Sequence, residues 1–263
     1  MLHKIKKMNA ANHAYVNSLT DEKGITTITF YHPAHNSLPS NLLLQLTEAI
    51  ENAGNNIDTR VIILKSAGDR TFCAGASFDE LLQIKDKNTG TVFFSGFANV
   101  INACRKAKKI ILARVQGKAV GGGVGLAAAA DYCLAADAAA VKLSELAIGI
   151  GPFVISPAVV RKIGMPAFSQ LTIRATDFQT AQWAKVNGLY NEVYTDIDAL
   201  DTAVAGLAEK LAAYHPGALT GLKQILWEGT GNWDTLLAER AAISGELVLS
   251  DFTQNALLEF KNK

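Results

Sequence analysis

The sequence predicts an α/β protein whose carboxyl-terminal third is mainly helical, and three observations support this prediction. Up to Pro157, segments typical of buried strands alternate with segments of helical periodicity. Beyond Pro157 the strand signals fade and helical patterns follow one another. Hydrophobic residues make up 49% of the 263 residues, which is ample for a substantial core. Such alternation is typical of parallel βαβ units with right-handed crossovers, and it fits a spiral of sheet wrapped by helices.

The elements of the first part follow in order. Residues 25–31 (ITTITFY) are β-branched and aromatic and end before Pro33, which predicts a strand. Start signals at residues 39–41 and leucines at helical spacing predict a helix through Ala53. We then expect a strand at residues 61–64, a helix at 91–106, a strand at 110–115 and an apolar helix at 122–130.

The later helices are expected at residues 180–186, 200–214, 218–227 and 233–249. Neither a low-complexity linker nor an internal repeat separates them from the rest. We therefore predict a core domain at residues 1–199, which holds the functional site, and a helical subdomain at residues 200–263.

Charge and cysteine content exclude several classes of function. The net charge of +1 gives no basic patch for nucleic acid or a membrane surface. Three cysteines without a CxxC pair provide neither a disulfide framework nor a zinc site, and they fit a reducing cytoplasm. The amino terminus has no apolar stretch typical of a secretory signal, and the apolar run at residues 119–130 is too short to span a bilayer. His32 and His35 have no acidic or cysteine neighbours that would make a metal site.

A first candidate segment, TFCAGASFD, covers residues 71–79. Small residues around Gly75 leave backbone NH groups uncovered, and a helix-like segment begins just beyond them. The partial positive charge of a helix start favours an anion placed against such donors. An ordinary tight turn is the alternative.

A second candidate segment, VQGKAVGGGVGL, covers residues 115–126. Three consecutive glycines between a strand and an apolar helix let backbone approach a ligand closely. The spacing matches neither the dinucleotide-binding fingerprint nor the P-loop. Close packing of the helix on the strand is the alternative.

A third candidate segment, VKLSELAIGIGPFVISP, covers residues 141–157 and sets the lone carboxylate of Glu145 among apolar residues. Burial favours the neutral form and raises the pKa of a carboxyl group, which suits general acid/base work near neutral pH. A surface glutamate in a loop is the alternative.

Together, and in this order, FCAGAS, GKAVGGGVGL and LSELAIGIGPFVISP resemble the crotonase (enoyl-CoA hydratase/isomerase) superfamily, and YHPAHNSL resembles its amino-terminal element. The resemblance implies a spiral of repeated ββα units with a helical carboxyl-terminal trimerisation region. It implies an acyl-CoA thioester as ligand, a homotrimer or dimer of trimers, and no cofactor beyond the coenzyme A of the substrate. It also implies that the backbone amides of Ala76 and Gly122 form an oxyanion hole for the thioester enolate.

The chain departs from the family at one of two glutamates. Glu145 matches the second glutamate, whereas Gly125 occupies the position of the first. The resemblance favours a hydratase that adds water to an enoyl-CoA or removes it, and the VISP segment is most similar to bacterial 3-methylglutaconyl-CoA hydratases of leucine breakdown. A Δ3,Δ2-enoyl-CoA isomerase, which needs one base, and a non-catalytic scaffold of the same fold are the alternatives. Asp79 or Glu80 could supply an assisting acid.

The resemblance also places the remaining contacts of the substrate. Coenzyme A contacts are implied at Ala34, His35, Ala74, Ser77, Phe78 and Asp79. Helices around Leu82, residues 93–97 and Phe153 are expected to build the acyl pocket. Cys73 beside the hole is expected to be a buried packing residue.

Overall fold

The computed structural model describes residues 13–261 and contains two β-sheets. The larger sheet has the order β1-β2-β3-β5-β7-β9 and is parallel except for the β1-β2 pair. Its strands are β1 (Tyr15–Thr20), β2 (Ile25–Tyr31), β3 (Val61–Ser66), β5 (Ile110–Val115), β7 (Tyr132–Ala136) and β9 (Glu192–Tyr194). The smaller, parallel sheet consists of β4 (Thr71–Cys73), β6 (Lys118–Val120) and β8 (Val141–Lys142). Each turn of the chain gives one strand to the larger sheet and the next to the smaller one, which produces the expected spiral of ββα units.

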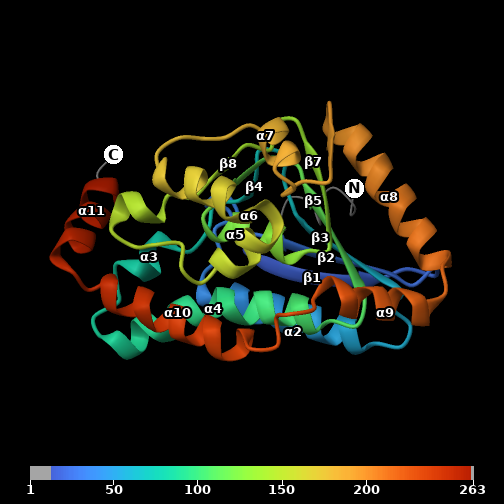
Figure 1. Cartoon of the computed structure of the whole chain (residues 1–263), viewed down its shortest axis with the longest axis horizontal. Helices are drawn as coiled ribbons and strands as arrows, with labels where there is room; N and C mark the ends of the chain where they lie inside the picture. The colour runs from blue at the N-terminus through green and yellow to red at the C-terminus, as the bar shows by residue number, and fades with distance from the viewer. Residues whose placement is uncertain (1–12, 262–263) are drawn as a thin grey trace, which may run out of the picture.

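Helices cover this spiral on several sides (Figure 1). They are α2 (Ser40–Asn55), α3 (Phe78–Leu81), α4 (Lys87–Lys106), α5 (Gly122–Ala129), the 3-10 helix η2 (Glu145–Ile148), α6 (Ser156–Ile173), α7 (Ala181–Val186), α8 (Ile197–Ala213), α9 (Pro216–Leu226), α10 (Trp233–Leu247) and α11 (Asp251–Lys261). Helices α2, α4 and α10 pack side by side below the sheets, whereas α8 packs against strands β3, β5 and β7. The main core lies between the two sheets and helices α2, α4, α5 and α6.

Two glycines let α4 and α10 cross with their backbones in contact. A Cβ added to Gly90 would lie 2.7 Å from the carbonyl oxygen of Gly245, and one added to Gly245 would lie 2.5 Å from the amide nitrogen of Thr91. Neither position can accept a side chain without moving a helix. This contact sets the distance between α4 and α10 at their crossing point.

A buried carboxylate ties the carboxyl-terminal helices to the spiral. Asp131, at the start of β7, accepts hydrogen bonds from Lys223 Nζ of α9 (2.7 and 2.9 Å), from Trp227 Nε1 (2.7 Å) and from the amide of Ile111 (2.7 Å). The Lys223 ammonium also donates to the Cys104 carbonyl at 2.9 Å. The Lys223 and Asp131 side chains are 3% and 2% exposed, so both charges are out of water. Removing either partner would strand the other charge in the interior.

The structure confirms the α/β class and most of the expected elements, with three kinds of difference. The helix expected at residues 91–106 begins at Lys87, where Asp86 caps it by accepting a 2.8 Å bond from the Thr89 amide. Strand β1, the short strands β6, β7, β8 and β9, and helix α11 were not predicted from the sequence. Helix α6 was not predicted either, because Gly164 and Pro166 interrupt its helical pattern.

The division into residues 1–199 and 200–263 stays a prediction, and its boundary falls inside α8. Arg114 of β5 makes a bidentate pair with Asp201 of that helix at 2.6 and 3.0 Å. Among the described residues, no helix is both long and apolar enough to cross a bilayer.

Candidate active site

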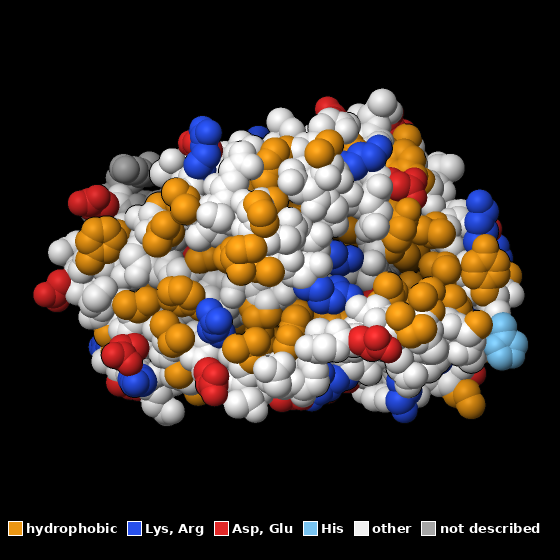
Figure 2. All heavy atoms as spheres, viewed as in Figure 1, with side chains coloured by type: hydrophobic (Ala, Val, Ile, Leu, Met, Phe, Trp, Pro, Cys, Tyr) orange, Lys and Arg blue, Asp and Glu red, His pale blue; other side chains and the backbone are white. Residues whose placement is uncertain are grey.

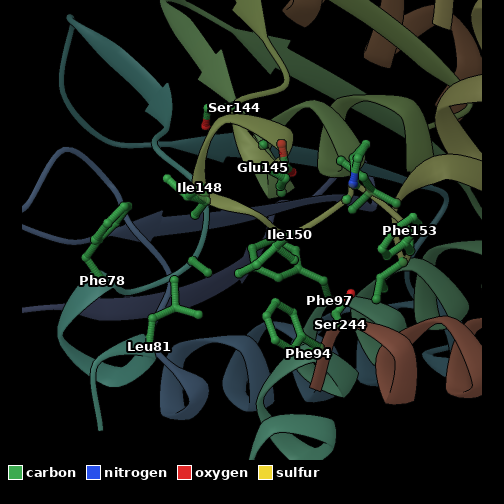
Figure 3. A pocket seen from close by; sticks show the side chains of 18 of the residues that line it. Phe78, Leu81, Phe94, Phe97, Ser144, Glu145, Ile148, Ile150, Phe153 and Ser244 are labelled. Carbon is green, nitrogen blue, oxygen red and sulfur yellow. The ribbon is translucent and has the colours of Figure 1, made fainter. Parts of the chain in front are cut away.

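A pocket that is open to solvent lies where the three candidate segments meet (Figure 3). The segments after β4 and β6, helix η2 and the loop behind it, and helices α3, α4 and α10 all contribute to its wall. Its apolar side chains include Phe78, Leu81, Phe94, Phe97, Ile148, Ile150 and Phe153. The pocket is therefore suited to an apolar group.

Gly75 brings the first segment against the second. It has φ +92°, and a Cβ there would lie 3.1 Å from the Val120 carbonyl oxygen and 3.5 Å from the Gly122 amide nitrogen. The Gly75 carbonyl accepts a 2.8 Å bond from Leu38, and its amide donates to Cys73 Sγ at 3.4 Å. The turn is thus fixed from both sides, and only glycine fits it.

The glycine run at residues 121–123 packs equally closely. Gly121 has φ +53° and donates its amide to the Lys142 carbonyl at 2.9 Å. A Cβ on Gly122 would enter the ring of Phe97, and a Cβ on Gly123 would meet the backbone of Cys73. The glycines allow close packing, as the alternative interpretation expected. Gly121 and Gly122 also line the pocket, and close approach of a ligand to them stays a prediction.

Two residues that line the pocket at this junction, Ala76 and Gly122, have backbone amides with no acceptor among the described residues. No hydrogen bond from the amide of Ala76 or of Gly122 is found within residues 13–261. Gly122 is the first residue of α5, where amide donors have no partner inside the helix and the helix dipole adds positive partial charge. A pair of such donors can hold an anionic oxygen.

Glu145 projects its carboxylate onto the glycine run. It is the first residue of η2, and its carbonyl accepts a 3.0 Å bond from Ile150, which holds the turn. Its Oε1 lies 2.9 Å from the position that a Cβ on Gly121 would occupy. Its Oε2 is buried and has no hydrogen-bond partner among the described residues. Burial raises the pKa of this carboxyl group from 4.5 to about 7, so that both of its protonation states are populated near neutral pH.

The position of the missing glutamate is filled by another side chain. A Cβ on Gly125 would lie 2.5 Å from Cγ2 and 2.8 Å from Cβ of Ile155, which itself lines the pocket. Glu80 does not replace it, because its carboxylate accepts bonds from the Ser40 amide (2.9 Å) and hydroxyl (2.7 Å) at the start of α2 and does not line the pocket.

The structure brings together five of the nine predicted site residues. Ala74, Ala76, Phe78, Gly122 and Glu145 line the pocket. Ser77, Asp79, Ala34 and His35 do not line it, and their predicted coenzyme A contacts stay predictions.

Two of these four residues adjoin pocket-lining residues along the chain, and the other two lie in the turn after β2. Ser77 is buried and accepts a 3.3 Å bond from the Glu80 amide as the cap of α3, and Asp79 follows in that helix with an exposed side chain. Ala34 and His35 are exposed in the turn after β2. That turn leads to Leu38, which pairs with Ala76 as an isolated bridge.

Other lining residues were only partly foreseen. Phe94, Phe97 and Phe153 line the pocket as expected, but Leu81 does so in place of Leu82. Ser244 of α10 was not predicted, and no motif near it in the sequence indicates a site. Cys73 is fully buried, which raises the pKa of its thiol to about 12 and agrees with a packing role.

Comparison with known proteins decides the family. The family model for enoyl-CoA hydratase/isomerase matches residues 20–257. The chain belongs to this family. Members of the enoyl-CoA hydratase/isomerase family are enzymes that act on coenzyme A thioesters. The predicted membership of the crotonase superfamily is thereby confirmed, whereas a particular kinship with 3-methylglutaconyl-CoA hydratases is not shown.

Three relatives show how widely the reactions of similar chains differ. A short-chain-enoyl-CoA hydratase of Clostridium acetobutylicum is 28% identical over 93% of this chain and 94% of its own. The carnitinyl-CoA dehydratase of Escherichia coli K12 is 31% identical over 79% of this chain and 78% of its own. A (7aS)-7a-methyl-1,5-dioxo-2,3,5,6,7,7a-hexahydro-1H-indene-carboxyl-CoA hydrolase of Rhodococcus jostii is 31% identical over 75% of each chain.

Solved structures agree on the fold. An enoyl-CoA hydratase of Bacillus halodurans superposes with a TM-score of 0.86 at 21% identity, over 93% of this chain and 99% of that one. An enoyl-CoA hydratase of Mycobacterium avium gives a TM-score of 0.83 at 24% identity, over 94% and 96% of the two chains. The crotonase fold with its helical carboxyl-terminal region is thus confirmed.

Proposed function

We propose that this enzyme adds water to the double bond of an enoyl-CoA thioester, or removes it in the reverse direction, through an enolate held by the amides of Ala76 and Gly122. Glu145 is its acid/base. The observation that carries the proposal is the Glu145 carboxylate, which lies against the glycine run with Oε2 buried and unpartnered among the described residues and with a pKa raised to about 7. The names of the C. acetobutylicum and E. coli relatives, a hydratase and a dehydratase, support the same class of reaction.

In this mechanism one carboxylate performs both proton transfers. Glu145 takes a proton from water as the water oxygen bonds to the β-carbon of the substrate. The electron pair of the double bond moves through the α-carbon to the thioester oxygen, and the resulting enolate is stabilised by the two amides. Glu145 then returns its proton to the α-carbon as the thioester carbonyl reforms. The reaction needs no metal or organic cofactor in this scheme.

An isomerase is the second candidate, favoured by the absence of a second acid among the described residues that line the pocket. Ile155 fills the space beside Gly125, so one base remains to move a proton between two carbons. In that reaction Glu145 would take a proton from the α-carbon of a 3-enoyl-CoA and return it to the γ-carbon. The same oxyanion hole would serve both reactions.

The experiment offers crotonyl-CoA, 3-methylglutaconyl-CoA and a 3-enoyl-CoA to the purified protein and follows product mass and double-bond position. Glu145→Gln should lower the rate by about 10² to 10⁴, whereas the exposed Glu239→Gln should leave it unchanged. Addition of water supports the hydratase, with the reactive substrate identifying the acyl group. Migration of the double bond at constant mass supports the isomerase. If no thioester reacts, the proposal is wrong, and the non-catalytic scaffold or another acyl-CoA chemistry takes its place. If the parent and the Glu145 variant react equally fast, Glu145 is not the acid/base and the proposed mechanism is wrong.

We also propose that the chain works as a homotrimer or a dimer of trimers, as its family resemblance implies. Large apolar side chains are exposed on α6, α9 and α11, where they are available for contacts between subunits (Figure 2). They include Met165, Ile225 and Phe252, which are 61%, 63% and 66% exposed. Light scattering that showed only a monomer would reject this proposal.

A further inference from the structure

The polar groups of the pocket wall are few and none is basic. Among the described residues that line it, no lysine, arginine or histidine occurs, and the polar side chains are Ser144, Glu145 and Ser244. A carboxylate at the far end of an acyl group would lose its hydration here without meeting a cation. It would also add negative charge to a cavity that already holds Glu145.

Ser244 is the one polar side chain on the α10 side of this pocket. In Figure 3 it lies beside Phe94, with Glu145 on the opposite side of the pocket. The residue is 1% exposed, and no hydrogen bond from its hydroxyl is found among the described residues. Its neighbour Gly245 makes the backbone contact with Gly90 that fixes α10, so the hydroxyl is held in place rather than free to turn away with the helix.

A fixed hydroxyl in an apolar wall discriminates between ligands. A hydrocarbon group that covers it removes it from water without offering a partner, which is unfavourable. A hydroxyl or carbonyl oxygen on the ligand supplies the missing hydrogen bond. Sites built to bond a substrate oxygen reject the analogue that lacks it more strongly than apolar pockets discriminate by size.

We propose, on the basis of the function proposed above, that the pocket takes an uncharged acyl group and that Ser244 determines specificity by bonding an oxygen at its far end. The matching substrate class is a 2-enoyl-CoA with a hydroxyl or carbonyl group remote from the thioester. Ser244 contacts the substrate away from the reacting carbons, so it affects which acyl group is used and not the chemical step.

The test compares three thioesters that differ only at the sixth carbon: 2-hexenoyl-CoA (methyl), 6-hydroxy-2-hexenoyl-CoA (hydroxyl) and 2-hexenedioyl-CoA (carboxylate). For the parent we expect kcat/KM to be highest for the hydroxyl compound and at least about tenfold lower for the carboxylate than for the methyl compound. Ser244→Ala should shift the hydroxyl-to-methyl ratio by about tenfold toward the methyl compound. Ser244→Lys should raise kcat/KM for the carboxylate relative to the other two.

Ser95→Ala is the matched control, because the Ser95 hydroxyl already donates to the Thr91 carbonyl at 2.7 Å and does not line the pocket. It should change none of the ratios. Calorimetric binding of the saturated counterparts (hexanoyl-, 6-hydroxyhexanoyl- and adipoyl-CoA) gives the same ranking without turnover. Equal use of the carboxylate compound, or ratios unmoved in Ser244→Ala, would overturn this inference. The expected binding order with no turnover of any thioester would instead reject the proposed function alone.

Discussion

Replacing Glu145 by glutamine should make the protein more stable at alkaline pH, although it removes the proposed catalytic group. The carboxyl pKa is raised by burial from 4.5 to about 7. Since one pKa unit corresponds to about 1.4 kcal/mol, holding this group ionised costs the folded state about 3 kcal/mol at pH 8. Glutamine has nearly the same shape and carries no charge, so Glu145→Gln should raise the free energy of unfolding at pH 8 by up to about 3 kcal/mol.

The sign follows from proton binding. Between pH 4.5 and 7 the folded protein keeps a proton that the unfolded chain has released, so the parent loses stability as the pH rises through this window. Below the window Glu145 is neutral in both states and the cost vanishes. The stability advantage of the variant should therefore be small at pH 5 and largest at pH 8.

The assay is urea denaturation of parent and variant at pH 5 and pH 8, at one protein concentration, with the m-value confirmed to be unchanged. Glu239→Gln removes an exposed carboxylate of α10 and should differ little from the parent at either pH. A stability advantage of Glu145→Gln that is the same at both pH values would refute the reasoning. Burial of the carboxyl group lowers the free energy of unfolding only when the group is ionised, so the advantage must depend on pH.

Three further predictions concern the same site and its support. Because the proposed mechanism starts from the carboxylate of Glu145, kcat/KM should fall as the pH drops through about 7, and a flat profile from pH 6 to 8 would count against it. Lys223→Met strands the charge of Asp131 and should destabilise the fold by about 3 to 5 kcal/mol by urea titration, with partial recovery on adding Asp131→Asn. Gly125→Glu should cost about 3 kcal/mol or more because Ile155 occupies its space, and Ile155→Ala should restore part of the loss; an unaffected single variant would contradict the packing seen here.

Much of the site was accessible from the sequence because it is built from backbone. The proposed oxyanion hole needs small residues at fixed places in the chain, and Gly75 and the glycines at residues 121–123 are visible in the sequence as such residues. Glu145 was conspicuous as a lone acid among apolar residues, and in the structure its Oε2 is buried, while its catalytic role stays a prediction. Features of this kind depend on residues that are adjacent in the chain, so they can be recognised in the sequence.

The parts that were missed depend on distant contacts. Ser244 reaches the pocket only because Gly90 and Gly245 allow two helices to cross closely, and neither glycine looks unusual in its own helix. Strand β7 (YCLAA) is alanine-rich and short, so its strand identity comes from the neighbours with which it pairs. For the same reason nothing adjacent to Gly125 indicated that Ile155 would fill the vacant position.

The pairing of Asp131 with Lys223 has a consequence for how the chain is made. The two residues are 92 positions apart, and Trp227, a second partner of the same carboxylate, follows later still. At about 5 to 20 residues per second, the ribosome delivers Lys223 roughly 5 to 20 s after Asp131. During that interval the Asp131 carboxylate lacks the ammonium and indole donors that hold it in the finished fold. Completion of the interior therefore waits for one of the last helices to be synthesised.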